Sequence, residues 1–154
     1  MLLGDLISPE AVVPSLKVKN KKQLLQDLAS RAARLTGLPE RTIFDTLLQR
    51  ERLGSTGLGQ GIAIPHCKLP GLKRIVGLFA RLAEPIDFDA VDGVPVDLVF
   101  VLLAPEGAGA DHLKALARIS RLLREAQAID KLRSSKDAGA LYAVLTEEAT
   151  SHAA

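Results

Sequence analysis

The stretch from residue 54 to residue 68 combines closely spaced glycines with a histidine that follows a proline. Glycine adopts positive φ without steric cost and lets backbone N–H groups approach a ligand, and successive N–H groups can form an anion-binding nest. A neutral imidazole is nucleophilic and has a pKa near physiological pH. The pattern therefore predicts that His66 accepts and releases a phosphoryl group beside a phosphate-binding loop. The predicted loop residues are Ser55, Thr56, Gly57, Gly59 and Gly61.

Three further side chains are candidates for contacting that phosphoryl group. Arginine binds phosphate oxygens through paired hydrogen bonds, and Arg50 and Arg52 lie just ahead of the loop. His112 falls in the first turn of an expected helix, where backbone N–H groups favour anions. Each feature also has a plain structural interpretation. His66 can be a structural or surface histidine, and the glycines can merely turn the chain. Arg52 can complement a helix C-terminus, and His112 can be a solvated helix start.

Other chemistries fit the sequence poorly. No Gly-x-x-x-x-Gly-Lys string followed by Ser or Thr is present, and Ile64 stands where a dinucleotide-binding motif needs its third glycine. Cys67 directly follows His66, and neighbours on an extended segment point to opposite sides, which argues against a thiol–imidazole catalytic pair. His66, Cys67 and His112 also lack the short paired spacing of zinc ligands. We therefore expect no metal and no cofactor.

The composition is that of an ordinary globular protein. The chain has 154 residues, of which 47% are hydrophobic and 25% charged, with a net charge of +2. The small charge and the 3% aromatic content argue against nucleic-acid binding. One cysteine excludes an intrachain disulfide, and no apolar run approaches the roughly 20 residues of a membrane helix. We expect a cytoplasmic protein without a membrane partner, with one domain over residues 1–150 and a frayed tail over 151–154 that includes His152.

Two helices are expected ahead of the glycine loop. Asn20 and Gln23 have the spacing of a capping box, and the apolar stripe that follows them is stopped by Gly37. Pro39 suits the first turn of a second helix, which Gly54 ends. The chain thus passes directly from this helix into the loop.

Strands and further helices are expected after the loop. Residues 62–64 form a short apolar run before Pro65, so His66 should lie where a buried strand emerges. Strands are expected over 75–82 and 96–103, with the second central and buried and the turn-rich segment 84–93 connecting them. Helices are expected from an N-cap at Asp111 to residue 123, over 129–132 and over 137–148. This order predicts an α/β (α+β) fold, a three-layer helix–sheet–helix sandwich around a mixed β-sheet.

The segment from Arg50 to His66 resembles the active-site signature of the phosphotransferase-system enzyme IIA proteins of the mannitol/fructose/nitrogen-regulatory class. The resemblance continues through residues 84–93, the strand that begins at Pro95 and the sequence His112-Leu-x-x-Leu. Within the class the chain is most similar to nitrogen-regulatory enzyme IIA, because it stands without a fused carrier or sugar-permease domain. It departs from the family pattern at Cys67, where most relatives have glycine, and at Leu58, where isoleucine is commoner.

The resemblance implies a regulatory protein-histidine phosphotransferase component. His66 would be phosphorylated by a small phosphocarrier protein of the HPr or NPr type, with Arg50 and His112 assisting at the phosphoryl group. The phosphorylation state would then govern binding to regulatory target proteins. Two alternatives stay open: a sugar-transport enzyme IIA that passes the phosphate to a IIB domain, and an interaction module without transfer.

Overall fold

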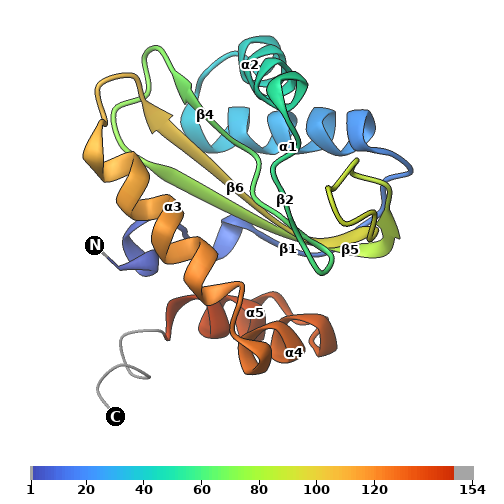
Figure 1. The fold of residues 1–154 in the computed structure, drawn as a ribbon. Helices are drawn as coiled ribbons and strands as arrows, with labels where there is room; N and C mark the ends of the chain where they lie inside the picture. Colours follow the sequence, from blue (N-terminus) through green and yellow to red (C-terminus); the bar gives the residue numbers. More distant parts are fainter. Residues whose placement is uncertain (1, 148–154) are drawn as a thin grey trace.

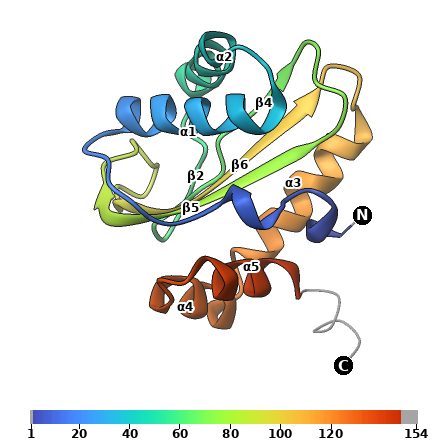
Figure 2. The ribbon, with the colours of Figure 1, turned by 180° about the vertical axis from the view of Figure 1, so that it is seen from behind.

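The centre of the fold is a mixed β-sheet of six strands with helices on both faces (Figures 1 and 2). The computed structural model describes residues 2–147, so the predicted tail at 151–154, with His152, lies outside the described residues. The strands are β1 (Val12–Leu16), β2 (Gly57–Gly59), β3 (Ile62–Ala63), β4 (His66–Leu69), β5 (Val76–Ile86) and β6 (Val96–Pro105). The helices are α1 (Lys21–Thr36) and α2 (Glu40–Leu53) on one face, and α3 (Ala110–Leu122), α4 (Ala126–Ser134) and α5 (Ala138–Thr146) on the other. The predicted three-layer arrangement is confirmed.

Strand β6 is the central strand, as its continuous apolar run predicted. It pairs with β5 on one side in antiparallel fashion, and with β3 and then β4 on the other side in parallel. The strand order is β1-β5-β6-β3-β2, and β1 runs parallel to β5. Almost every side chain of β6 is buried, with Phe100 fully so. A parallel strand covered on both faces accounts for this composition.

The helices on the α1 side begin and end close to the predicted residues. Asn20 caps α1 by accepting a hydrogen bond from the Gln23 backbone, and Gly37 ends α1 with a φ of 77°. The Gln23 side chain, however, accepts from the backbone N–H of Lys19 rather than from that of Asn20, so the capping box is only half formed. Gly54 ends α2, which delivers the chain straight into the loop.

The prediction of Asp111 as an N-cap is wrong. The N-cap of α3 is Gly109, whose φ of 51° lets the chain turn into a helix that begins one residue later, at Ala110. Asp111 therefore lies inside the first turn, where its charge still complements the helix dipole. The cap of α5 follows the usual pattern, since the Asp137 carboxylate accepts from the Ala140 backbone.

Three short strands have no counterpart among the predicted ones. Strands β1, β2 and β4 have only five, three and four residues, against eleven in β5 and ten in β6, so they leave no long apolar run in the sequence. Strand β1 also carries Pro14 at the sheet edge, where proline is tolerated. Strand β5 also continues through Pro85 to Ile86, because an irregularity after Arg81 lets Ile86 pair with Val96. None of the helices within residues 2–147 is long and apolar enough to cross a membrane.

Candidate phosphoryl-transfer site

His66 lies at a break in the strand that flanks β6. Strand β3 pairs with the first half of β6 and β4 with the second half, and the pairing is interrupted at Ile64 and Pro65. Proline has no N–H to donate, so the ladder cannot continue through it. The prediction that the histidine sits where a short strand ends is confirmed, although the chain at once resumes pairing as β4, with His66 opposite Leu102.

The strand break orients the imidazole of His66. Its Nδ1 lies 2.8 Å from the carbonyl oxygen of Ile64. A carbonyl can only accept, so Nδ1 carries the proton and donates it. In the neutral ring the lone pair is then on Nε2, which makes Nε2 the nucleophilic nitrogen.

The surroundings of His66 favour this neutral ring. Burial lowers the pKa of His66 from its ordinary value of 6.5, the hydrogen bond to Ile64 raises it, the positive charge of Arg50 lowers it and the negative charge of Glu51 raises it. Burial is the largest of these effects, and it disfavours the charged imidazolium. A neutral imidazole is the protonation state in which a histidine can act as a nucleophile.

His112 is a buried neighbour of His66. The centroids of the two rings are 5.7 Å apart, and His112 reaches this position from the first turn of α3. Burial lowers the pKa of His112, as do the charges of His66 and Lys68. Among the described residues, no hydrogen-bond partner is present for its buried Nδ1. The ring therefore has unused hydrogen-bonding capacity beside His66, which is unusual for a buried polar group.

Arg50 approaches the same site from the last turn of α2. Its Nη1 donates to the carbonyl oxygen of Gly54 at 2.9 Å, and its charge acts on His66. The guanidinium has five N–H donors, so this bond leaves others for a ligand. Arg52 is exposed, which agrees with its plain interpretation at a helix end. The structure thus brings His66, Arg50 and His112 together from β4, α2 and α3.

The predicted loop residues fall into two groups. The segment folds as a hairpin in which Gly57 lies opposite Ala63, and Thr56 accepts a hydrogen bond from the Ile64 backbone. Ser55, Thr56 and Gly57 therefore lie at the end of the hairpin next to the His66 segment. Gly59 and Gly61 lie at its far tip.

The distance from the hairpin tip to His66 follows from the sheet register. Ile62 is opposite Leu98, whereas His66 is opposite Leu102. Four residues of strand correspond to about 13 Å. The tip instead lies against Arg133. A Cβ added to Gly61 would come within 2.5 Å of the Arg133 guanidinium, and the φ of Gly61, +85°, is in the region that favours glycine. The turn and these contacts account for glycine at the tip.

Sequence reasoning missed one acidic residue of the site. Glu51 is buried, accepts hydrogen bonds from both the backbone N–H and the hydroxyl of Thr56, and forms an ion pair with Lys21 at 2.9 Å. A signal was available, because Ile43, Leu47 and Glu51 follow one another at intervals of four and so share a face of α2. That face is the buried one.

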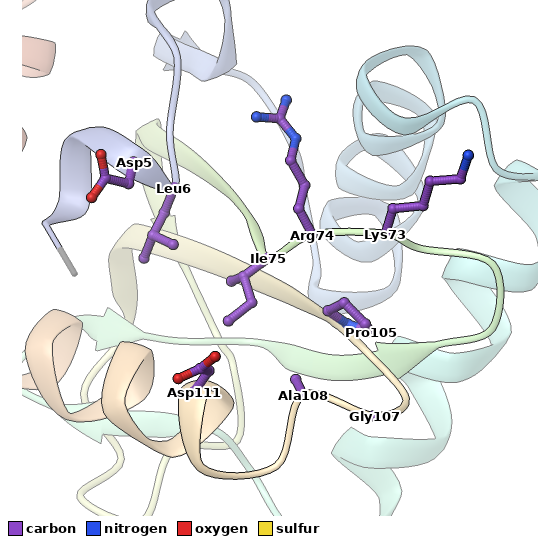
Figure 3. Close-up of a pocket in the computed structure, with 9 residues that line it drawn as sticks. All are labelled: Asp5, Leu6, Lys73, Arg74, Ile75, Pro105, Gly107, Ala108 and Asp111. Atoms are coloured by element: carbon purple, nitrogen blue, oxygen red, sulfur yellow. The ribbon is translucent and has the colours of Figure 1, made fainter.

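A pocket separate from this site lies between the N-terminal turn, the start of β5 and the connection from β6 to α3 (Figure 3). Its volume is about 690 Å³, and none of the predicted site residues lines it. The charged side chains around it are exposed and of both signs. They are Asp5, Lys73, Arg74 and Asp111. The mixed charge does not select one class of charged ligand.

Comparison with known proteins identifies the family. Residues 5–148 match the family described as "Phosphoenolpyruvate-dependent sugar phosphotransferase system, EIIA 2". The chain belongs to this EIIA family. The resemblance drawn from the stretch between Arg50 and His66 is thereby confirmed, and proteins of the EIIA family carry phosphoryl groups.

Within the EIIA family, the chain is similar to nitrogen regulatory proteins. It is 65% identical over 145 residues to the nitrogen regulatory protein of Bradyrhizobium diazoefficiens, covering 94% of this chain and 95% of the relative. It is 44% identical to that of Pseudomonas aeruginosa, with the same coverage. The crystal structure of nitrogen regulatory protein IIA-Ntr from Neisseria meningitidis matches with a TM-score of 0.89 and 38% identity, covering 94% of this chain and 99% of that one. The predicted similarity to the nitrogen-regulatory branch is confirmed.

Proposed function

We propose that the chain accepts a phosphoryl group on Nε2 of His66 from the phosphohistidine of an HPr- or NPr-type phosphocarrier, and signals through its phosphorylation state. The observation that carries the proposal is the 2.8 Å hydrogen bond between Nδ1 of His66 and the Ile64 carbonyl. It leaves the lone pair of a neutral, half-buried imidazole on Nε2, beside Arg50 and His112. Membership of the EIIA family supplies the class of reaction.

The transfer is a displacement at phosphorus. The lone pair of Nε2 forms a bond to phosphorus while the P–N bond of the donor phosphohistidine breaks, and that electron pair returns to the donor ring. The proton on Nδ1 stays in its bond to Ile64, which stabilises the positive charge that develops on the ring. Phosphoryl transfer otherwise requires mainly that the reacting groups are positioned and that the charge on the phosphoryl oxygens is stabilised.

Arg50 and His112 supply that stabilisation. Free guanidinium donors of Arg50 bind phosphoryl oxygens in charge-assisted bonds, each worth about 1.5–3 kcal/mol. His112 is neutral and donates a ring N–H to a phosphoryl oxygen. We assign Ser55, Thr56 and Gly57 as the part of the loop next to the phosphoryl group, because the hairpin register carries Gly59 and Gly61 away from it.

Exposed apolar side chains beside the site support a protein as the phosphoryl donor. Leu53, the last residue of α2, is 85% exposed, and Leu113, next to His112, is 67% exposed. Phosphorylation of His66 adds a charge of roughly −1.5 to −2 at pH 7 next to this surface. A regulatory target that binds here would distinguish the two states.

Phosphorylation by a charged carrier tests the proposal. With phosphoenolpyruvate, an upstream enzyme I and a phosphocarrier, intact-mass measurement should show one acid-labile phosphoryl group, and none on His66→Ala. Arg50→Ala should slow the transfer while the circular-dichroism spectrum is kept. Arg41→Ala is the matched control, since Arg41 lies on the same helix with an 88% exposed side chain. Incorporation of a phosphoryl group into His66→Ala would refute the proposal. Efficient transfer of the phosphoryl group from the chain to a sugar-specific IIB domain would show a role in sugar transport and refute the regulatory role.

A further inference from the structure

A continuous series of hydrogen bonds connects helix α1 to the His66 imidazole. Lys21 in the first turn of α1 pairs with Glu51 of α2, and Glu51 accepts from the backbone N–H of Thr56 at 3.1 Å. The Thr56 carbonyl accepts from the Ile64 N–H at 3.0 Å, and the Ile64 carbonyl accepts from Nδ1 of His66. Each link is a direct contact. The two ends come from parts of the sequence 45 positions apart.

We infer that Glu51 is a positioning residue for the nucleophile: its buried carboxylate, paired with Lys21, fixes Thr56 and thereby the Ile64 peptide that orients His66. The inference deepens the proposed function and rests on His66 being the phosphoryl acceptor. Glu51 does not itself contact the reacting atoms. It acts through two intervening residues, Thr56 and Ile64.

The geometry of Thr56 supports this role. Its backbone N–H and its hydroxyl both donate to the Glu51 carboxylate, one to each oxygen. Two bonds to one rigid, planar group define both the position and the direction of the Thr56 backbone. The side chain of Glu51 is only 2% exposed, so water cannot replace these donors. A carboxylate buried to this degree requires such partners.

The Ile64 peptide transmits that direction to the imidazole. Its N–H is committed to Thr56 and its carbonyl to His66, while the next residue, Pro65, has no N–H of its own. A shift of Thr56 therefore changes the acceptor on which the Nδ1 proton of His66 depends. Without that acceptor the proton can move to Nε2, which would remove the nucleophilic lone pair.

Lys21 adds a second connection to the loop. Its ammonium lies 4.3 Å from the centroid of the Phe88 ring, and the Phe88 carbonyl accepts from the Ser55 hydroxyl. The Ser55 hydroxyl in turn accepts from the Gly57 N–H at 3.1 Å. The same ion pair thus supports the loop on both sides of Thr56.

The test compares Glu51→Gln with Asp45→Asn, which makes the same acid-to-amide change at an exposed ion pair of the same helix. Steady-state transfer from the phosphocarrier gives kcat and KM, and nitrogen-15 NMR of the histidine rings gives the tautomer of His66. A misplacement of the nucleophile lowers the rate about ten- to a hundredfold. We expect that loss in kcat for Glu51→Gln, an unchanged KM for the carrier and a mixture of His66 tautomers, while Asp45→Asn behaves as the wild type.

A second variant keeps the test decisive where Glu51→Gln does not fold. Thr56→Val retains the shape of the side chain and the Glu51–Lys21 pair but removes the hydroxyl donor. Because the backbone N–H of Thr56 still donates to Glu51, we expect a smaller fall in kcat and a smaller change of tautomer in the same direction. An unchanged kcat and an Nδ1-protonated His66 in the folded variants would overturn the inference. A wild-type chain that is not phosphorylated would instead refute the proposed function, so the two failures are distinguishable.

Discussion

Removing the Lys21 ammonium should leave a buried charge without its partner. Glu51 has a side chain exposed to only 2%, and Lys21, at 17%, is its one ion-pair partner among the described residues. The substitution Lys21→Met keeps a long apolar stem but withdraws the charge. The Thr56 hydrogen bonds remain, so Glu51 keeps part of its stabilisation.

These contacts determine how much free energy of unfolding Lys21→Met should lose. Breaking a buried ion pair by removing one partner destabilises a protein by about 3–5 kcal/mol. Because Thr56 still donates to Glu51 and Lys21 is partly exposed, we expect the lower end, about 3 kcal/mol. For a domain of this size that corresponds to a fall in the melting temperature of roughly 6–12 °C.

Urea denaturation and thermal unfolding of four variants measure this loss: Lys21→Met, Glu51→Gln, the double variant and a control. Arg41→Met is the matched control, because it removes a cation from an ion pair with side chains 88% and 53% exposed, which is worth about 0.3–0.5 kcal/mol. The double variant Lys21→Met/Glu51→Gln should be more stable than the sum of its single variants by at least about 1 kcal/mol. A loss for Lys21→Met within about 1 kcal/mol of the control would refute the reasoning.

Three further predictions concern single residues. Because burial lowers the pKa of His66 below 6.5, an NMR titration should place the midpoint of its imidazole below pH 6.5. The free energy that the neutral ring contributes to folding should be fully present well above pH 6.5 and be lost as the pH falls below it, and a midpoint above 6.5 would contradict this. Burial raises the pKa of Cys67 to about 12, so thiol reagents at pH 8 should label it only after unfolding, and rapid labelling of the native protein would exclude such burial. Gly61→Ala should lower the free energy of unfolding measured in urea by about 1–2 kcal/mol, through its positive φ and the approach to Arg133, and an unchanged unfolding midpoint would contradict this.

The parts of the fold that sequence reasoning captured are those with local causes. The continuous apolar run of β6 requires a strand covered on both faces, and Gly37 and Gly54 mark helix ends through their own backbone freedom. The position of His66 after a short strand followed from Ile62 and Pro65 alone. Each of these inferences needed only neighbouring residues.

The parts that it missed depend on contacts between distant segments. Glu51 is buried because Lys21, 30 positions earlier, and Thr56 neutralise and bind its carboxylate. Gly61 faces Arg133, which comes from the far end of the chain. The Ile64 carbonyl is an imidazole acceptor only because the sheet pairing is interrupted there. Spacing places Glu51 on the same face of α2 as Ile43 and Leu47, but it does not identify any of these distant partners.

The central claim is that His66 carries the phosphoryl group on Nε2, and one measurement tests it most directly. The chain is labelled with nitrogen-15 in its histidines, phosphorylated through the carrier, and examined by NMR for coupling between phosphorus and the ring nitrogens. We predict coupling to Nε2 of His66, with the Nδ1 proton retained in its bond to Ile64. Coupling to Nδ1 of His66, or to a nitrogen of His112, would contradict the account.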